Sequence, residues 1–136
     1  MQCNPYLVFN GNCEQAFKFY EKVLGGKIIA MMSFGETPAA EHTEQEHLGK
    51  IAHARMTFGS NTLMASDAPP QYYEAMKGLS VSLVVDTPEE AERIYNAFAE
   101  GAEIKMPMQE TFWAVRYGML TDRFGAPWMI NYEKKQ

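Results

Sequence analysis

The sequence has little cysteine, little positive charge and no long apolar run. The two cysteines among 136 residues, Cys3 and Cys13, form no CxxC motif, which argues against a disulfide framework or a cysteine-based metal site. The longest apolar run, Ile28 to Met32, has five residues, whereas a membrane span needs roughly 20. Lysine and arginine (12) are outnumbered by aspartate and glutamate (17), so neither a nucleic acid nor a membrane is expected as a partner. The first residues contain no basic region and no apolar stretch, so we expect no signal peptide and a reduced, cytoplasmic protein.

What the sequence does contain is typical of one globular domain. Apolar residues make up 46% and charged residues 21%, while glycine (10) and proline (7) are near their average frequencies. This composition excludes a disordered or collagen-like chain, and the length fits the roughly 100–200 residues of one domain. Methionine is frequent, with 10 residues, and its flexible side chain fills irregular cores and lines adaptable apolar surfaces.

The chain contains an internal repeat. A shift of 75 positions brings together a short apolar run, a polar helix start, apolar residues at helical spacing and a glycine, in the same order. Asn12 and Thr87 suit the N-caps of the two predicted helices, and Gly25 and Gly101 suit their ends. The aligned segments are Leu7–Phe9 with Ser82–Val84, Ala16 with Ala91, Tyr20 with Tyr95, and Gly26 with Gly101.

Each copy of the repeat predicts a β-α-β-β-β module, and the two modules predict an α+β fold. Residues 1–136 are expected to form a single domain, with module one at 1–67, a connection at 68–78 and module two at 79–136. The polar stretch 35–49 is expected to form a surface loop or a frayed helix. The predicted strands that follow the helices are 27–33, 51–58 and 62–67 in module one, and 103–108, 112–121 and 127–132 in module two.

Six short motifs resemble the PhnB-like branch of the vicinal oxygen chelate superfamily, which includes glyoxalases, bleomycin-resistance proteins and extradiol dioxygenases. In that superfamily two tandem β-α-β-β-β modules form a mixed curved sheet with a cleft, and two-fold dimers are common. The resemblance therefore implies a glyoxalase/bleomycin-resistance-like sheet with a cleft, and a homodimer. The motifs are PYLVFNGNC (5–13), FYEKVLG (19–25), IAHA (51–54), LMASD (63–67), QETFW (109–113) and DRFGAPW (122–128).

The resemblance also locates four positions that hold a divalent metal in the metalloenzymes of the superfamily. Motif matching places them at Pro5 and Ser80 in the first strands of the modules, and at Met64 and Met129 in the last strands. Metals of this kind bind imidazole, carboxylate or water, and a pyrrolidine ring or a thioether is no such ligand. We therefore expect no metal at these positions and no other cofactor.

Strand alternation predicts which side chains line the cleft. Met64, Ser80 and Met129 face it if the residues one step away face the helices, and those neighbours are apolar. The other members follow from an expected pairing of Phe58 with Leu63 across the first hairpin. For the second hairpin we assume the same relation, in which an odd-numbered residue shares a face with an even-numbered one. The predicted cleft residues are Phe9, His53, Arg55, Met64, Ser80, Ser82, Arg116 and Met129.

Arg55 and His53 are the candidates for chemistry in this cleft. A buried arginine needs a partner, which is either a carboxylate of the chain, such as Glu110 or one from 35–49, or an anionic or polar ligand. His53 is either a hydrogen-bonded strand residue or a general acid/base that contacts the ligand.

Three further features have structural interpretations. His42, Glu46 and His47 invite a metal site at helical spacing, yet without a fixed partner elsewhere a solvated loop is the simpler interpretation. The two tryptophans are expected to anchor the core or an interface, and the motif 122–128 is expected to form a turn with a glycine at positive φ. The residues concerned are Trp113, Trp128, Asp122 and Gly125.

The residues favour binding over metal-dependent chemistry. The first hypothesis is a PhnB-like protein without the usual metal ligands that binds a small, partly apolar molecule in its cleft. The alternative is a metal-independent enzyme of the same superfamily, in which His53 is the acid/base and Arg55 or Arg116 stabilises negative charge. A third hypothesis is a metalloenzyme with ligands from other strands, for instance His53 with Glu110 or with the loop histidines. The sequence leaves open whether any reaction is catalysed.

Overall fold

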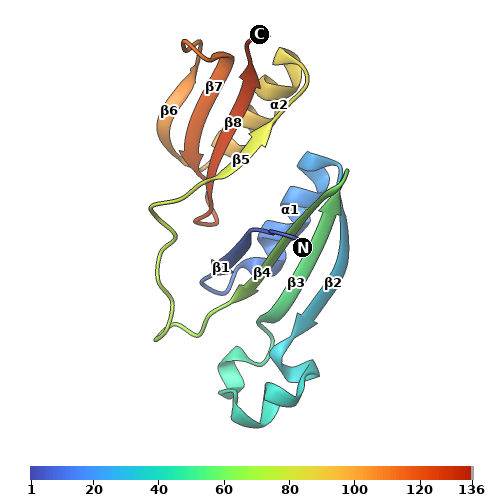
Figure 1. The fold of residues 1–136 in the computed structure, drawn as a ribbon. Helices are drawn as coiled ribbons and strands as arrows, with labels where there is room; N and C mark the ends of the chain where they lie inside the picture. Colours follow the sequence, from blue (N-terminus) through green and yellow to red (C-terminus); the bar gives the residue numbers. More distant parts are fainter. Residues whose placement is uncertain (136) are drawn as a thin grey trace. The chain divides into compact units, whose positions relative to one another are not determined.

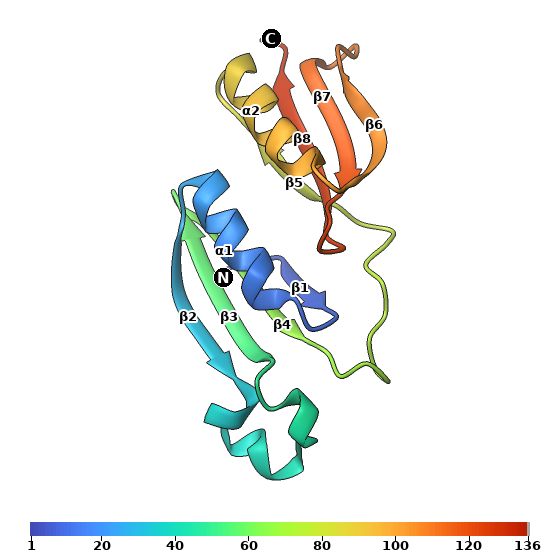
Figure 2. The same cartoon turned by 180° about the vertical axis from the view of Figure 1, so that it is seen from behind.

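Each half of the chain folds into a helix that covers one face of a mixed four-stranded sheet (Figures 1 and 2). The structure, a computed structural model, describes residues 1–135. Its first compact unit is Met1–Glu74 and its second begins at Ala75, so the division falls within the stretch 68–78. The predicted α+β class with two tandem modules is confirmed, and each module has its own sheet.

Module one arranges its strands in the order β1-β4-β3-β2. β1 is parallel to β4, and the other neighbours are antiparallel. Three short 3-10 helices connect β2 to β3, where the sequence predicted a surface loop or a frayed helix. The elements are β1 (Tyr6–Phe9), α1 (Cys13–Leu24), β2 (Lys27–Ser33), η1 (Phe34–Glu36), η2 (Pro38–His42), η3 (Gln45–His47), β3 (Ile51–Phe58) and β4 (Asn61–Asp67).

Module two repeats this plan in the order β5-β8-β7-β6, with β5 parallel to β8. No helix among residues 1–135 is long and apolar enough to cross a membrane. The elements are β5 (Val81–Val84), α2 (Pro88–Ala99), β6 (Glu103–Gln109), β7 (Ala114–Thr121) and β8 (Pro127–Glu133).

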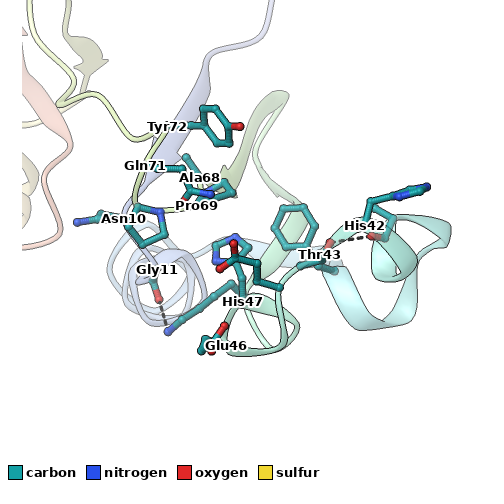
Figure 3. A pocket seen from close by; sticks show the side chains of 15 residues that line it. Asn10, Gly11, His42, Thr43, Glu46, His47, Ala68, Pro69, Gln71 and Tyr72 are labelled. Atoms are coloured by element: carbon teal, nitrogen blue, oxygen red, sulfur yellow. Dashed lines mark hydrogen bonds between the residues drawn. The ribbon is translucent and has the colours of Figure 1, made fainter.

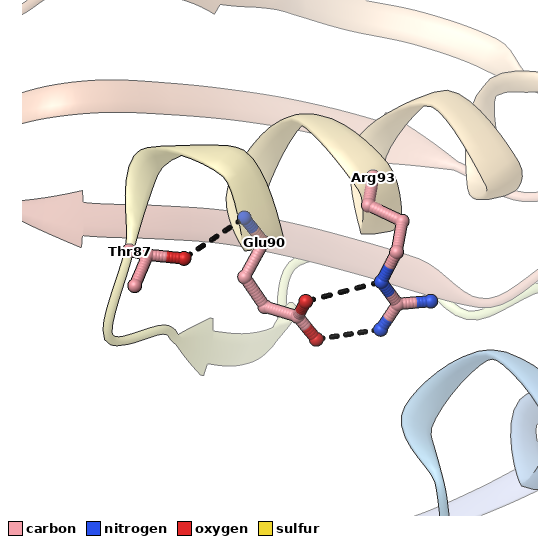
Figure 4. A network of polar contacts seen from close by, with 3 residues as sticks. All are labelled: Thr87, Glu90 and Arg93. Atoms are coloured by element: carbon pink, nitrogen blue, oxygen red, sulfur yellow. Dashed lines mark hydrogen bonds and ion pairs between the residues drawn. The ribbon is translucent and has the colours of Figure 1, made fainter.

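The two helices are capped in different ways. At α2 the predicted N-cap is confirmed, because the Thr87 hydroxyl accepts a hydrogen bond from the Glu90 amide at 3.1 Å (Figure 4). The Glu90 carboxylate also pairs with Arg93, and this hydrogen bond lowers the pKa of Glu90. At α1 the Asn12 side chain makes no capping hydrogen bond. Instead the first amide, that of Cys13, donates to the carboxylate of Asp67 at 3.0 Å, so a residue distant in sequence caps the helix.

The core of each module lies between its helix and one face of its sheet. In β1 and β4 buried residues alternate with more exposed ones, as a half-covered sheet requires. Each fully buried large apolar side chain contributes about 1.5–3 kcal/mol to folding. The largest fully buried side chains are Phe9, Phe17, Tyr20, Met56 and Leu63 in module one, and Phe98, Leu120, Trp128 and Ile130 in module two.

The first hairpin has a different register from the one expected, but its side chains lie on the expected faces. Phe58 pairs with Asn61, whereas the sequence predicted a pairing with Leu63. The difference is two residues, and because side chains alternate with a period of two, an even shift leaves every side chain on its predicted face. Met56 and Leu63 are accordingly buried against α1, while Arg55 and Met64 share the opposite face.

The repeat alignment is correct in the helices and wrong by one position in the first strands. Ala16 and Ala91 are both fully buried, as a shift of 75 requires. Leu7 is also buried, but its aligned partner Ser82 is exposed and the neighbouring Leu83 is half-buried. The loop that joins the first strand to the helix therefore differs in length by one residue between the two copies.

Gly118 lies where β7 passes directly under α2. A Cβ atom at this position would lie 2.7 Å from Cε2 of the buried Tyr95 ring. We expect Gly118→Ala to lower the free energy of unfolding by about 1–3 kcal/mol, because the ring would have to move within a packed core. Urea denaturation measures this change.

Gly49→Ala is the matched control, since a Cβ at Gly49 meets nothing within 4 Å. This variant should unfold at the same urea concentration as the wild type. Equal stability of the Gly118→Ala and Gly49→Ala variants would contradict the close approach of β7 to α2.

Candidate functional site

The face of the module one sheet opposite α1, here called the helix-free face, carries the candidate residues of that module. A row of cross-strand partners runs over all four strands, from Tyr6 in β1 through Met64 and Arg55 to Ala30 in β2. His53 lies two residues from Arg55 on the same strand and the same face. Its ring stacks on that of Tyr6, with centroids 6.0 Å apart and planes inclined by 26°. The structure therefore places His53, Arg55 and Met64 on one face of the sheet, together with Tyr6, and a ligand-binding cleft on this face stays a prediction.

Arg55 is half-buried in this row and has no charged partner. It forms no ion pair among residues 1–135, and its buried Nε has no hydrogen-bond partner. Glu110, one of the carboxylates considered as its partner, pairs with Lys134 at 3.1 Å. A guanidinium in this state retains hydrogen-bonding capacity for an anion.

Two residues of module one do not lie where the sequence placed them. Phe9 is fully buried and belongs to the face of β1 that also carries Leu7, so its assignment to the cleft is wrong. The same displacement affects the position that the motif matching assigned to Pro5. Tyr6, and not Pro5, lies beside Met64, while the Pro5 carbonyl accepts a hydrogen bond from the Met64 amide. The predicted alternation in β1 was displaced by one residue, and such a displacement exchanges the two faces of the strand.

In module two the helix-free face is rich in methionine. Ser82 pairs with Met129, Met129 with Met119, and Met119 with Met106, so one row crosses all four strands. Ser80 precedes β5 at the same parity as Ser82 and is half-buried. These positions agree with the predicted faces of Ser80, Ser82 and Met129. A common cleft formed by residues of both modules stays a prediction.

Arg116 is on the other face, and its assignment to the cleft is wrong. Its guanidinium pairs with Glu92 of α2, and its cross-strand partner is Tyr132, at the same parity as the buried Trp128. The cause is the length of the second turn. Thr121 pairs with Pro127 there, so two odd-numbered or two even-numbered residues share a face in the second hairpin. In the first hairpin an odd-numbered residue shares a face with an even-numbered one.

The side chains beside Met64 and Met129 are not of the kinds that bind a divalent metal. Module one offers a proline or a phenol beside Met64, and module two offers a serine beside Met129. None of these groups is an imidazole or a carboxylate. Within the described part of the chain, no three His, Cys, Asp or Glu side chains are placed to hold a metal ion, the loop residues His42, Glu46 and His47 included.

A cavity of about 650 Å³ lies at one end of module one, where the sequence analysis placed no site (Figure 3). Three segments line it: the turn after β1, the connection between β2 and β3, and the chain after β4. Sequence spacing could not indicate it, because these segments are distant in sequence and meet only at the end of the sheet. The aromatic and ionisable side chains in its wall are Phe34, His42, Glu44, Glu46, His47, Lys50 and Tyr72.

The remaining candidates have structural roles. The indole Nε1 of the fully buried Trp128 donates to Asp122 at 2.9 Å, and the Asp122 carboxylate also accepts the amides of Phe124 and Ala126. Gly125 has a φ of 97°, as the predicted turn requires. Trp113 is 40% exposed. It contacts the rings of Phe112 and Tyr117 edge-on.

The comparisons with known proteins identify the class to which this fold belongs. A family model described as the Glyoxalase/Bleomycin resistance protein/Dioxygenase superfamily matches residues 2–130. The chain belongs to this superfamily, and the family predicted from its motifs is confirmed.

Individual relatives share the whole length of the chain. Protein YjdN of Escherichia coli (strain K12) is 37% identical over 144 residues, which cover 100% of this chain and 98% of YjdN. Among solved structures, protein PA1353 from Pseudomonas aeruginosa is 51% identical, with 99% of each chain covered and a TM-score of 0.90. A PhnB protein from Bacillus cereus is 21% identical, with 97% of this chain and 99% of that chain covered and a TM-score of 0.81. This last likeness concerns the fold.

The two free cysteines differ in burial. Cys3 is exposed, whereas Cys13 is buried at the start of α1. Burial raises the pKa of the Cys13 thiol, and the negative charges of Asp67 and Glu14 raise it further. Since the thiolate is the reactive form, we expect iodoacetamide to modify Cys3 alone in the folded protein.

Intact-mass spectrometry should show one added carbamidomethyl group under native conditions and two after denaturation. A Cys3→Ser variant should add none while folded. Rapid modification of Cys13 in that folded variant would contradict its burial.

Proposed function

We propose that the protein binds a small, partly apolar anion on the helix-free face of module one without a metal. The observation that carries this proposal is the unpartnered, half-buried guanidinium of Arg55. An arginine without a partner in a partly buried place is costly, and a bound carboxylate or phosphonate would offset this cost through paired hydrogen bonds. Metal-free binding is supported by the donor groups beside Met64 and Met129, none of which suits a divalent cation.

The neighbours of Arg55 suit the apolar part of such a ligand. Met64 supplies a flexible thioether directly across the strand pair, and Tyr6 supplies an aromatic ring that is 46% exposed. His53 lies against that ring and can donate or accept a hydrogen bond. A planar acid with a hydrophobic body would therefore find both an ionic and an apolar partner on this face.

Replacing Arg55 tests the ionic part of the proposal. With phenylacetate as the probe, we expect Arg55→Met to weaken binding by about tenfold or more, because a charge-assisted hydrogen bond contributes about 1.5–3 kcal/mol. Titration followed by two-dimensional NMR measures the affinity and shows which amides shift. In the wild type the shifts should centre on β3 and β4.

Arg93→Met is the matched control, since Arg93 lies on the exposed side of α2 in module two. It should bind phenylacetate with the wild-type affinity. An Arg55→Met variant that binds as tightly as the wild type, or a wild type whose shifts lie elsewhere, would refute the assignment.

A second candidate function is metal-independent proton transfer, with His53 as the base. The observation that favours it is the placement of His53 and Arg55 on one face of one strand, two residues apart. A base beside a guanidinium can remove a proton next to a carbonyl group while the positive charge stabilises the enolate. The probe is phenylpyruvate in D2O, in which the methylene protons exchange for deuterium through that enolate.

We expect wild-type protein to accelerate this exchange and His53→Ala to abolish the acceleration, as followed by NMR of the methylene signal. His42→Ala, which changes an exposed histidine of the same module, should keep it. Exchange that is equally fast with His53→Ala, or equally slow with and without wild-type protein, would remove His53 from a catalytic role.

The homodimer and the cytoplasmic location, which the sequence and the family resemblance imply, stay predictions.

A further inference from the structure

Hydrogen bonds hold the 34–50 part of the wall of the module one cavity. The amide of Phe34 donates to the carbonyl of Lys50 at 2.9 Å, and the amide of Gly35 donates to that of Leu48 at 2.9 Å, which extends the β2–β3 pairing beyond the strands. The Thr37 hydroxyl donates to the Phe34 carbonyl, and the Thr43 hydroxyl donates to that of Ala39. A cavity of about 650 Å³ in such a setting has the size of a small-molecule site.

The charge in this wall is predominantly negative. Glu44 and Glu46 both line the cavity, and neither carboxylate forms an ion pair or a hydrogen bond with residues 1–135. The stretch 35–49 contains four glutamates and no lysine or arginine. Lys50 is the one lysine of the lining, and its ammonium group donates to the Gly11 carbonyl at 3.1 Å.

The other walls are aromatic and apolar, with one unsatisfied polar atom. Phe34 and His47 lie with ring centroids 4.8 Å apart, and Tyr72 stands on the opposite segment (Figure 3). His47 is only 8% exposed, and its buried Nε2 has no hydrogen-bond partner among the described residues. The Nε2 atom is covered by the chain, so the part of His47 that lines the cavity is the rest of its ring.

We propose that this cavity is a second binding site, which takes a small organic ammonium compound with an aromatic body. The carboxylates of Glu44 and Glu46 attract the ammonium group, and aromatic faces such as those of Phe34 and Tyr72 bind both a cation and an apolar ring. The site is separate from the helix-free face, because none of its lining residues belongs to the row formed by Tyr6, Met64 and Arg55.

The test uses phenethylamine as the probe, in a two-dimensional NMR titration of the full chain. We expect amide shifts confined to residues 10–11, 34–50 and 68–72. The anion 3-phenylpropanoate, which carries the same ring with the opposite charge, should cause no shifts there. Glu44→Gln/Glu46→Gln should weaken phenethylamine binding by about threefold to tenfold, since each exposed carboxylate contributes modestly.

The matched control is Glu41→Gln/Glu74→Gln, which removes the same charge from the same compact unit, Met1–Glu74, at two exposed residues outside the cavity lining. It should bind phenethylamine as the wild type does, and so should Arg55→Met, which separates this site from the anion site. The proposal is overturned if phenethylamine shifts no cavity amides, if both double variants weaken binding equally, or if 3-phenylpropanoate binds there as well.

Discussion

Module one depends on the buried carboxylate of Asp67, which is 3% exposed at the end of β4. One of its oxygens accepts the amides of Gly11 and Cys13 at 3.0 Å each, and the other accepts the amide of Ile51 at 2.9 Å. A single side chain thus joins the turn after β1, the start of α1 and the start of β3. Without it three amides would lack an acceptor, at a cost of about 1–3 kcal/mol for each one that is buried. The same contacts position Gly11 and the neighbourhood of Lys50, two parts of the cavity wall.

The second copy uses a buried carboxylate in a more local way. Asp122 binds the amides of its own turn and the indole of Trp128, six residues away. Its turn is therefore stabilised within the β7–β8 hairpin, and α2 has its own cap at Thr87. The helix-free faces have diverged as well, since one presents His53 and Arg55 and the other a row of methionines. The two modules thus share one backbone plan and a buried core, while their other faces carry different side chains.

Sequence reasoning predicted the elements well because apolar periodicity and turn residues report local structure. It also placed His53, Arg55, Met64 and Ser82 on the faces where they are found, because one pattern of alternation covers a whole strand. The wrong face assignments of Phe9 and Arg116 have one physical origin. Which face a strand residue occupies depends on the number of residues in the adjoining loop, and no local sequence pattern specifies the conformation of that loop. The cavity was missed for a different reason. Its wall is assembled by hydrogen bonds between segments remote in sequence, and the acidic stretch 35–49 alone looks like an ordinary solvated loop.

The β3–β4 hairpin shows which changes of strand register this architecture can accept. Its observed pairing differs from the expected one by two residues, and the buried face is the same in both. A difference of a single residue would have placed Met56 and Leu63 on opposite faces, so one of them would have left the core. Slippage of β3 against β4 should therefore be tolerated only in steps of two residues. A residue inserted within either strand, rather than in the turn, would have to be accommodated as a β-bulge that keeps the apolar side chains under α1.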